Sequence, residues 1–429
     1  MSQEEQKSTV DLYSQYVAPT YGRFNIFPQR GEGVFLWDEN GSRFLDFSGG
    51  VAVNSLGHSH PDLVKVICNQ ADELVHCSNL YQHRGQAELA RLLTEEVVGI
   101  NGKCFFCNSG TEANEGLIKL ARKFGEVSPS SIGEPRHEIL SFNGSFHGRT
   151  TGGMAATGQE KIRSGFGPLM EGFKYLPFND VTELINGVSD KTVAILMEPV
   201  QGEGGINVAS SEFLSAVQEI CQKKNILLFF DEVQCGIGRC GDLCGWRVIP
   251  NAQEIKPDAI SWAKGLGGGF PIGASWIRDK SINDLSLCDL LGPGTHGSTF
   301  GGAPLASSVA STVVRKIIDE NICDNVINLG ELINRELQSR PIPFITELRG
   351  LGLMLGFQVN AKAINEIRDF QKTNKTPALF LVELLADSGL LTVPAGSDVI
   401  RWLPPLIVKE NEIMEALEIM RTVFERINT

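Results

Sequence analysis

The stretch ILLFFDEVQCGIGR, residues 226–239, begins with five apolar residues and then changes to a carboxylate, Asp231. A run that is apolar at every position predicts a strand buried on both faces, as in a parallel sheet. Open α/β sheets hold ligands at the carboxyl ends of such strands. We therefore expect Asp231 at a binding site, where a protonated ring nitrogen could be its partner. Backbone amides at the strand end are the alternative partners.

Short apolar runs of the same kind recur along the middle of the chain and alternate with helical patterns. The runs are residues 104–107, 138–142, 193–197, 259–262 and 273–277. The helical patterns include residues 112–123 and 211–224. This alternation predicts an α/β fold with a mostly parallel central sheet and crossover connections.

The two ends of the chain have a different pattern. Residues 20–60 hold strand candidates, among them GVFLWDENGSRFLDF, in which Glu39-Asn40-Gly41 favours a hairpin. Long helical patterns follow residue 310, and short strands are expected near 352–359 and 399–403. We expect both ends to form one smaller α+β domain, with residues 1–60 and 311–429 flanking a large domain at 61–310.

The composition is that of an ordinary soluble protein, with 42% hydrophobic and 21% charged residues among 429. This length suggests about two domains. The net charge of −13 argues against binding to nucleic acid or to an anionic membrane. The chain has no stretch of 18 apolar residues, so we expect no membrane-spanning helix.

The ten cysteines follow no secretory signal, so we expect reduced thiols and a cytoplasmic location. Cys104 and Cys107 have the spacing of metal ligands, but no second matching pair follows them. Cys235, Cys240 and Cys244 form a looser cluster. We expect a metal at neither place, and the sequence assigns no role to Cys240 or Cys244.

The segment CNSGTEANEGLIKLARKF, residues 107–124, joins the end of an apolar run to an amphipathic helix. Ser109 and Glu112 fit a capping box, so a well-capped helix is one interpretation. The other is an anion site, because free N–H groups and the dipole at a helix N-terminus attract a phosphate. The GxxxxGK[ST] pattern of a P-loop is absent.

The hexapeptide SFHGRT, residues 145–150, follows another expected strand. The phenyl ring of Phe146 can stack there on a planar heterocycle. The guanidinium of Arg149 can bind a carboxylate through two parallel hydrogen bonds. Taken alone, the hexapeptide is better explained by a core phenylalanine and a surface arginine.

The segment SWAKGLGGGFPIGA, residues 261–274, has one charged side chain, that of Lys264. Its glycines do not form the dinucleotide pattern G-x-G-x-x-G, which fails at Phe270. A desolvated lysine has a lowered pKa and becomes an amine nucleophile suited to a Schiff base with an aldehyde. A phosphate-binding turn, a stacking phenyl ring, an aspartate for a ring nitrogen and this lysine are the groups that pyridoxal 5′-phosphate requires.

Six motifs in this order carry a family resemblance. NSGTEAN, FHGRT, EPVQGEGG, DEVQCGIGR, AKGLGGGFPIGA and HGSTFGGAPLA resemble the class III, or subgroup II, aminotransferases of fold type I, over roughly residues 20–425. GGVAVNSLGHSHP and HCSNLY most resemble the acetylornithine aminotransferases. The resemblance implies transfer of the 5-amino group of N2-acetyl-L-ornithine to 2-oxoglutarate, in arginine biosynthesis. Ornithine, succinylornithine, N-succinyl-diaminopimelate and 4-aminobutyrate are the alternative donors.

The resemblance also implies roles around a bound pyridoxal phosphate. Lys264 would carry the cofactor and move protons as base and acid, while Asp231 would keep the ring nitrogen protonated. The other implied cofactor contacts are Gly110 and Thr111 at the phosphate, Phe146 on the ring face, and Val233 and Gln234 beside the ring. The glycines after Lys264 are expected to let the backbone turn closely around the cofactor.

Substrate contacts and a homodimer with shared sites follow from the same resemblance. Ser298 would lie beside the substrate, and Thr299 would reach the cofactor phosphate of the neighbouring subunit. Arg149 would bind the carboxylate far from the reacting amine, and Arg401 the α-carboxylate of glutamate or 2-oxoglutarate. Glu203 would pair with Arg401 when the other substrate is bound. A purely structural Arg401–Glu203 ion pair is the alternative.

Two other classes of protein predict different sequences. A nicotinamide-dependent dehydrogenase needs a dinucleotide fingerprint after its first strand, and this chain has none there. A catalytically silent cofactor-binding protein would have lost Lys264, Asp231 or the two arginines, and all of them are present.

Overall fold

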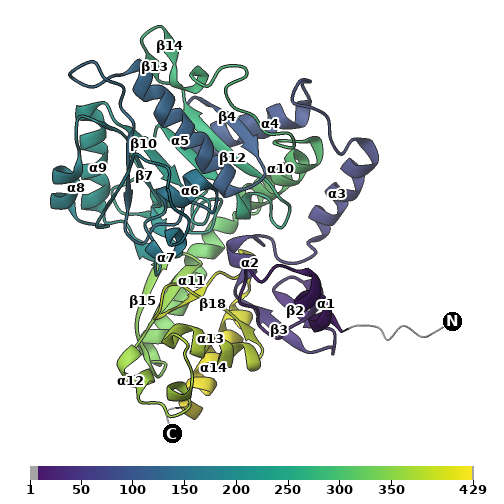
Figure 1. Cartoon of the computed structure of the whole chain (residues 1–429). Helices are drawn as coiled ribbons and strands as arrows, with labels where there is room; N and C mark the ends of the chain where they lie inside the picture. The colour runs from purple at the N-terminus through teal and green to yellow at the C-terminus, as the bar shows by residue number, and fades with distance from the viewer. Residues whose placement is uncertain (1–7, 428–429) are drawn as a thin grey trace.

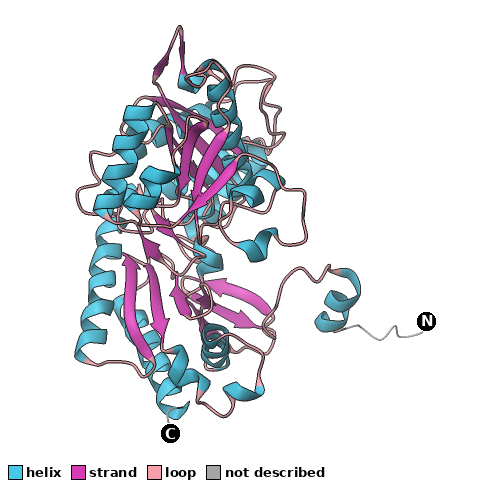
Figure 2. Cartoon of the chain, turned by 60° about the vertical axis from the view of Figure 1, so that its left-hand side comes forward, coloured by secondary structure: helices cyan, strands magenta, loops and turns pink. Residues whose placement is uncertain are grey.

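The computed structural model describes residues 8–427, from the start of α1 (Thr9–Tyr16) to the end of α14 (Glu410–Ile427). Figure 1 shows an upper body built around one large sheet and a lower body in which the purple start and the yellow end of the chain lie together. In Figure 2, the strands of the two bodies are seen as separate groups. This arrangement agrees with a large α/β domain and a smaller domain made from both chain ends.

The upper body is organised by a seven-stranded sheet. Its spatial order is β4 (Gly102–Cys107), β12 (Gly273–Arg278), β11 (Ala259–Trp262), β10 (Leu227–Asp231), β7 (Thr192–Met197), β5 (Glu138–Phe142) and β6 (Phe173–Leu176). The pairs β11–β10, β10–β7, β7–β5 and β5–β6 are parallel. The predicted mostly parallel sheet is therefore confirmed, and β10, which carries Asp231, lies in its centre.

Two strands depart from the sequence interpretation. Strand β12 is antiparallel to both of its neighbours. The connection between β11 and β12 is too short for a crossover, which needs about a dozen residues or more. Strand β6 was not predicted, because its residues FKYL are mostly only partly buried at a sheet edge and form no continuous apolar run.

Helix α5 (Gly110–Val127) covers one face of this sheet, as Figure 1 shows. Its buried stripe, with Leu117 and Phe124, packs in one cluster with Leu227 and Phe229 of β10. The alternate β10 residues, such as Phe230, belong to a second core cluster. Strand β10 is thus buried on both faces, as its apolar run predicts, and its carboxyl end delivers Asp231 to the interior.

The other elements of the upper body surround this sheet. The helices are α3 (Pro61–Glu73), α4 (Arg84–Leu92), α6 (Thr151–Ala156), α7 (Glu160–Arg163), α8 (Val181–Gly187), α9 (Ser211–Lys224) and α10 (Pro304–Asp319). Two short hairpins are formed by β8 (Val200–Gln201) with β9 (Asn207–Val208), and by β13 (Ser281–Ile282) with β14 (Leu285–Ser286). The helix predicted over 211–224 is confirmed as α9, which packs against β7 and β10.

The lower body contains two four-stranded sheets. One has the order β1 (Pro28–Glu32), β2 (Phe35–Asp38), β3 (Arg43–Asp46) and β17 (Leu390–Leu391). The other has the order β15 (Ile345–Leu351), β16 (Met354–Val359), β19 (Val399–Trp402) and β18 (Val393–Pro394). The helices here are α2 (Gly49–Ala52), α11 (Ile322–Ser339), α12 (Ala361–Asn365), α13 (Pro377–Asp387) and α14.

The two chain ends meet in the first of these sheets. Strand β17 pairs in parallel with β3, which joins residues near 45 to residues near 390. The predicted hairpin is also present: β2 and β3 are antiparallel, and Asp38 accepts hydrogen bonds from the backbone of Asn40 and Ser42 at the turn. The domain boundaries at residues 60 and 310 stay a prediction, since α10 runs across residue 310.

Candidate active site

Asp231 lies at the carboxyl end of β10 with only 3% of its surface exposed. Its Oδ2 atom lies 2.7 Å from the amide nitrogen of Asn114 and 2.8 Å from Nδ1 of His147. Its Oδ1 atom accepts a hydrogen bond from the backbone N–H of Val233. A backbone amide is thus one of its partners, as the alternative interpretation expected, but two buried side chains hold the other oxygen in a fixed direction.

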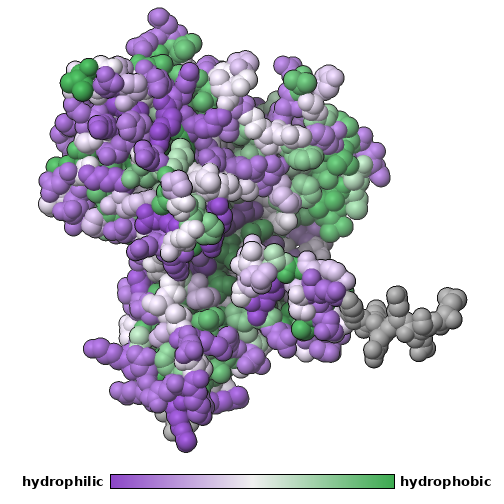
Figure 3. Space-filling model, in the orientation of Figure 1, coloured by the Kyte–Doolittle hydropathy of each residue, from purple (hydrophilic) through white to green (hydrophobic). Residues whose placement is uncertain are grey.

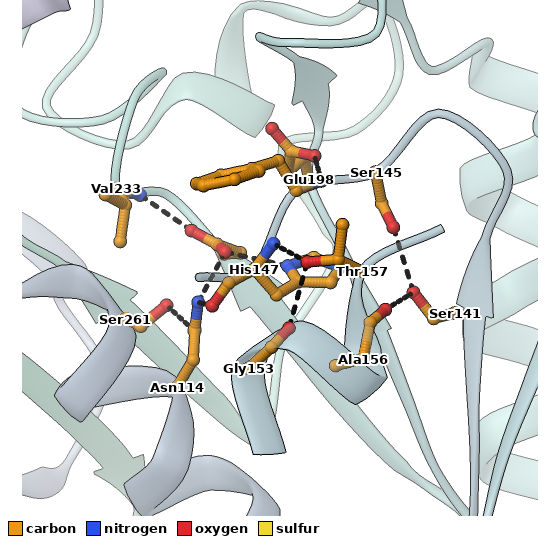
Figure 4. Close-up of polar contacts among 12 residues, drawn as sticks. Asn114, Ser141, Ser145, His147, Gly153, Ala156, Thr157, Glu198, Val233 and Ser261 are labelled. Atoms are coloured by element: carbon orange, nitrogen blue, oxygen red, sulfur yellow. Dashed lines mark hydrogen bonds and ion pairs between the residues drawn. The ribbon is translucent and has the colours of Figure 1, made fainter. Parts of the chain in front are cut away.

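A further set of hydrogen bonds fixes the partners of Asp231 (Figure 4). The amide oxygen of Asn114 accepts from the hydroxyl of Ser261 at 2.6 Å, and its amide nitrogen also donates to the carbonyl of His147. The backbone N–H of His147 donates to the hydroxyl of Thr157. The carboxylate of Asp231 is therefore held by residues from helix α5, strand β11 and the segment before α6.

Lys264 follows β11 after one residue, Ala263, and begins a short 3₁₀ turn. Its φ of +44° is in the left-handed region, which is strained for a residue with a side chain. Burial lowers the pKa of its amine below the usual 10.5, with a smaller opposing effect from Glu203. Within residues 8–427, no hydrogen bond or ion pair engages the Nζ atom of Lys264.

Two of the glycines after Lys264, Gly265 and Gly267, have no space for a side chain. A Cβ atom at Gly265 would lie 2.7 Å from the hydroxyl of Ser55, and one at Gly267 would lie 1.9 Å from the carbonyl oxygen of Phe270. The contacts that exclude a side chain at these two glycines are therefore with the chain itself. The expectation that the glycines also let the backbone turn closely around a cofactor stays a prediction.

The N-terminus of α5 begins at the predicted turn. Ser109 caps it by accepting from the N–H of Glu112, as expected. The carboxylate of Glu112 reaches back to the N–H of Asn108 at 2.9 Å and not to that of Ser109, so the capping box is displaced by one residue. The hydroxyl of Thr111 lies 2.8 Å from that of Thr150. Gly110 lies against Val233, because a Cβ here would come within 2.7 Å of its side chain.

Phe146 and Arg149 lie together on the segment between β5 and α6. The Phe146 ring is half-buried, and its backbone N–H donates to the carboxylate of Glu198 at 2.9 Å. Arg149 is exposed, with its guanidinium carbon 5.5 Å from the centroid of the Phe146 ring. The arginine is thus free to meet a ligand at the surface, beside a ring that could stack on one.

Arg401 lies on β19 and is almost entirely buried. Its Nη1 atom donates to Glu203 at 2.6 Å, to the side-chain oxygen of Gln234 at 2.8 Å and to the carbonyl of Gly202 at 3.0 Å. Burial alone would raise the pKa of Glu203, but the nearby guanidinium outweighs it and lowers that pKa. The structure therefore brings Arg401, Glu203 and Gln234 together.

Ser298 and Thr299 belong to a loop before α10. The hydroxyl of Ser298 accepts from the side chain of Asn108 and from the N–H of Gly301, both at 3.1 Å, which holds it near the start of α5. Thr299 is exposed. Its contact with a neighbouring subunit stays a prediction.

A comparison with protein families gives the family. A family model, aminotransferase class-III, matches residues 16–424. This chain is a class III aminotransferase. It is 43% identical to a protein named acetylornithine aminotransferase from Caldanaerobacter subterraneus subsp. tengcongensis, over 96% of this chain and 98% of that protein.

Two solved structures resemble this aminotransferase closely in fold. An ornithine aminotransferase from Toxoplasma gondii has a TM-score of 0.86 and 31% identity, over 99% of this chain and 96% of that one. An N-acetylornithine aminotransferase from Stenotrophomonas maltophilia has a TM-score of 0.77 and 32% identity, over 97% and 98% of the two chains. The predicted family is confirmed, and a dehydrogenase is excluded.

The cysteines of the aminotransferase are free thiols. Cys104 and Cys107 are three residues apart on one strand, so their side chains point to opposite faces and cannot share a metal. Cys240 is buried in a core cluster, and Cys244 donates to the carbonyl of Val97. Across the described residues, no group of three or more histidine, cysteine or acidic side chains could hold a metal ion.

The described part of the aminotransferase has no helix that combines the length and the apolar character needed to cross a bilayer.

Sequence interpretation missed Asn114 and His147 as partners of Asp231. Both stand inside the quoted motifs NSGTEAN and FHGRT, and Asn114 interrupts the buried stripe of a helix. A polar residue on a buried helix face is the signal that could have identified it, because such a group needs a partner.

Proposed function

We propose that this aminotransferase moves the 5-amino group of N2-acetyl-L-ornithine to 2-oxoglutarate. The products are N-acetyl-L-glutamate 5-semialdehyde and L-glutamate, as a step of arginine biosynthesis. The observation that carries the proposal is the buried Arg401–Glu203 pair, because it gives one site two charge states for two kinds of substrate. The 43% identity to a protein named acetylornithine aminotransferase supports this choice of donor.

The residues of the site fit pyridoxal 5′-phosphate. Lys264 offers a partly buried amine that no hydrogen bond or ion pair from the described residues engages, and the related Toxoplasma gondii structure holds this cofactor at its active site. When bound, the cofactor supplies an aldehyde that accepts the amino group and a ring that takes up negative charge from the reacting carbon. The proposed contacts are Lys264 at the aldehyde, Asp231 at the ring nitrogen, Phe146 on the ring face, Val233 and Gln234 beside the ring, and Gly110 and Thr111 at the phosphate.

Lys264 is proposed as the group that moves the proton. Its lowered pKa favours the neutral amine, which can take a proton from the carbon that bears the amino group. The same amine, once protonated, can return the proton at the end of the transfer. Asp231 is proposed to face the ring nitrogen, and Asn114 and His147 hold its carboxylate in place.

The Arg401–Glu203 pair is proposed to distinguish the two substrates. N-acetylornithine has no carboxylate next to its reacting carbon, so Glu203 neutralises the buried guanidinium while this donor reacts. The α-carboxylate of glutamate displaces Glu203 and pairs with Arg401 itself. Arg149 would bind the distal carboxylate of either substrate, and Ser298 would lie beside it.

We propose a homodimer in which Thr299 reaches the cofactor phosphate of the neighbouring subunit. A groove of about 770 Å³ beside Ser298 is lined by Tyr81, Phe105 and Phe106. Large apolar side chains around it are exposed, with Leu80 89% and Phe300 61% accessible. Figure 3 shows apolar surface gathered on the right of the upper body.

A cytoplasmic location is proposed as well, since the ten free thiols suit a reducing compartment.

Ornithine is the second candidate donor. The TM-score of 0.86 with an ornithine aminotransferase exceeds that of 0.77 with an N-acetylornithine aminotransferase. Steady-state turnover of N-acetylornithine, ornithine, succinylornithine, N-succinyl-diaminopimelate and 4-aminobutyrate with 2-oxoglutarate separates these cases. We expect the highest kcat/KM for N-acetylornithine. An ornithine value larger by about tenfold, or about 1.4 kcal/mol of binding in the transition state, would show that the proposed donor is wrong.

A further inference from the structure

Glu198 is a buried carboxylate that none of the proposed roles uses. It follows β7 directly, beside the carboxyl end of β10, and only 5% of it is exposed. Its Oε1 atom accepts from the backbone N–H of Phe146 at 2.9 Å, and its Oε2 atom accepts from the backbone N–H of Gly202 at 3.0 Å. One side chain therefore joins two separate segments of the site.

Each of the two segments carries a residue with a proposed role. Phe146 presents its ring to the cofactor, and Gly202 immediately precedes Glu203. Gly202 is also held from its other end, because its carbonyl accepts from Arg401. Gly202 lies close to Gln234, since a Cβ at this glycine would lie 2.3 Å from the side-chain oxygen of that residue. The position of the Glu203 backbone thus depends on Glu198.

The chemistry of this contact needs a carboxylate. Two backbone N–H groups point at two different oxygens, and a glutamine has only one oxygen, with donor hydrogens in place of the other. Burial raises the pKa of Glu198 to about 7, and the charge of Asp231 adds to this rise while His147 opposes it. Within residues 8–427, Glu198 forms no salt bridge, so its two backbone hydrogen bonds are the direct contacts that compensate for the cost of burying it.

We propose that Glu198 is a positioning residue that couples the Phe146 side of the site to the Glu203–Arg401 pair. The inference rests on the proposed function, because it assumes that Glu203 neutralises Arg401 for the ω-amino donor. Displacing Gly202 would move Glu203 away from Arg401 and leave the guanidinium charged. The ω-amino donor would then react more slowly, whereas glutamate, which brings its own carboxylate, would be less affected.

The test is the variant Glu198→Gln, purified with bound cofactor. Single-turnover absorbance measurements give kcat/KM for two half-reactions: that of the ω-amino donor which the wild type uses best, and that of glutamate. We expect the ratio of the donor value to the glutamate value to fall about tenfold, the effect of one lost buried hydrogen bond. Weaker retention of the cofactor should accompany this change. A ratio within about twofold of the wild type would overturn the proposal.

Glu232 provides a matched control. It is equally buried, lies next to Asp231 in the sequence and also accepts from two backbone N–H groups, those of Gly245 and Trp246. Both donors belong to a short 3₁₀ helix, Gly245–Val248, that none of the proposed contacts includes. Glu232→Gln should lower thermal stability but leave the ratio of the half-reactions unchanged. The same ratio change in both variants would overturn the proposal, because it would show a general effect of losing a buried carboxylate.

A second variant, Glu198→Asp, tests the proposal if Glu198→Gln does not fold. Glu198→Asp keeps both oxygens on a shorter side chain, which cannot reach Phe146 and Gly202 together, and it must change the ratio in the same direction. An unchanged ratio in this variant would equally overturn the proposal. A wild type that does not use N-acetylornithine would refute the proposed donor alone, because the ratio is measured with the donor that the wild type prefers.

Discussion

The guanidinium of Arg401 and the carboxylate of Glu203 lie 2.6 Å apart, but they differ in exposure. The arginine side chain is 3% accessible and the glutamate side chain 31%. Gln234 and the carbonyl of Gly202 also hold Arg401, whereas within residues 8–427 the only other hydrogen bond to the Glu203 carboxylate comes from Gln234, at 3.5 Å. The arginine is therefore the more firmly held partner, and we propose that a substrate carboxylate displaces the glutamate.

Arg401→Lys tests the need for a guanidinium at this position. Lysine keeps the charge but loses the planar fork that binds a carboxylate through two hydrogen bonds. We expect KM for 2-oxoglutarate to rise at least about tenfold, with a smaller effect on the ω-amino donor. Steady-state kinetics with each substrate varied measures both. Arg349→Lys, on β15 and bonded to Asn207, is the control and should leave both values unchanged. Equal effects of Arg401→Lys on the two substrates would contradict this role.

Lys264→Ala tests the proton-moving role. Without the amine, the enzyme should still bind the cofactor through its other contacts but lose turnover by about 10²–10⁴-fold or more, the usual contribution of a positioned acid and base. Absorbance after gel filtration measures the retained cofactor, and a coupled glutamate assay measures turnover. Turnover close to that of the wild type in this variant would refute the assignment.

The stability of the cofactor-free enzyme toward unfolding should depend on pH through Lys264. Burial lowers the pKa of Lys264, so the folded state binds this proton more weakly than the unfolded chain does. The penalty to folding is complete below the lowered pKa and disappears as the pH rises from there to 10.5. Lys264→Met should therefore unfold at higher urea concentration than the wild type at about pH 7, and the difference should shrink as the pH approaches the ordinary lysine pKa. A difference that grows with pH would contradict the account.

The cysteines should differ in their rates of alkylation according to how deeply each thiol is buried. Burial raises the pKa values of Cys104 and Cys107 to about 12, whereas Cys68 is on the surface of α3. Because the thiolate is the reactive form, iodoacetamide at about pH 8 should modify Cys68 in the native enzyme and spare Cys107 and Cys240 until urea is added. Peptide mass spectrometry measures the labelling. Native labelling of Cys240 at the rate of Cys68 would show that this core is open.

The central strands could be predicted because local pattern determines them, whereas most site residues were named from the family resemblance and their roles stay predictions. The apolar run before Asp231 specifies a strand buried on both faces, whatever lies around it. The direction of β12 could also have been inferred, since its connection to β11 is short. Edge strand β6 could not, because its exposed side leaves no continuous apolar signal.

Contacts between distant segments were not predictable in this way. The bond between Asn114 and Asp231 joins residues 117 positions apart, and that between Glu198 and Phe146 joins residues 52 apart. Neither leaves a periodic pattern in the sequence. Gly265 shows the same limit, because its packing against Ser55 joins residues that are far apart in the sequence.

The central claim is that Glu203 neutralises Arg401 while the ω-amino donor reacts. Glu203→Gln tests this claim most directly, because it removes the charge and keeps the shape of the side chain. Single-turnover absorbance measurements give kcat/KM for N-acetylornithine and for glutamate. We expect the value for N-acetylornithine to fall about tenfold or more, since Arg401 is left buried and charged, and the value for glutamate to stay the same or rise. An equal loss with both substrates would contradict the claim and leave Arg401–Glu203 as a structural ion pair.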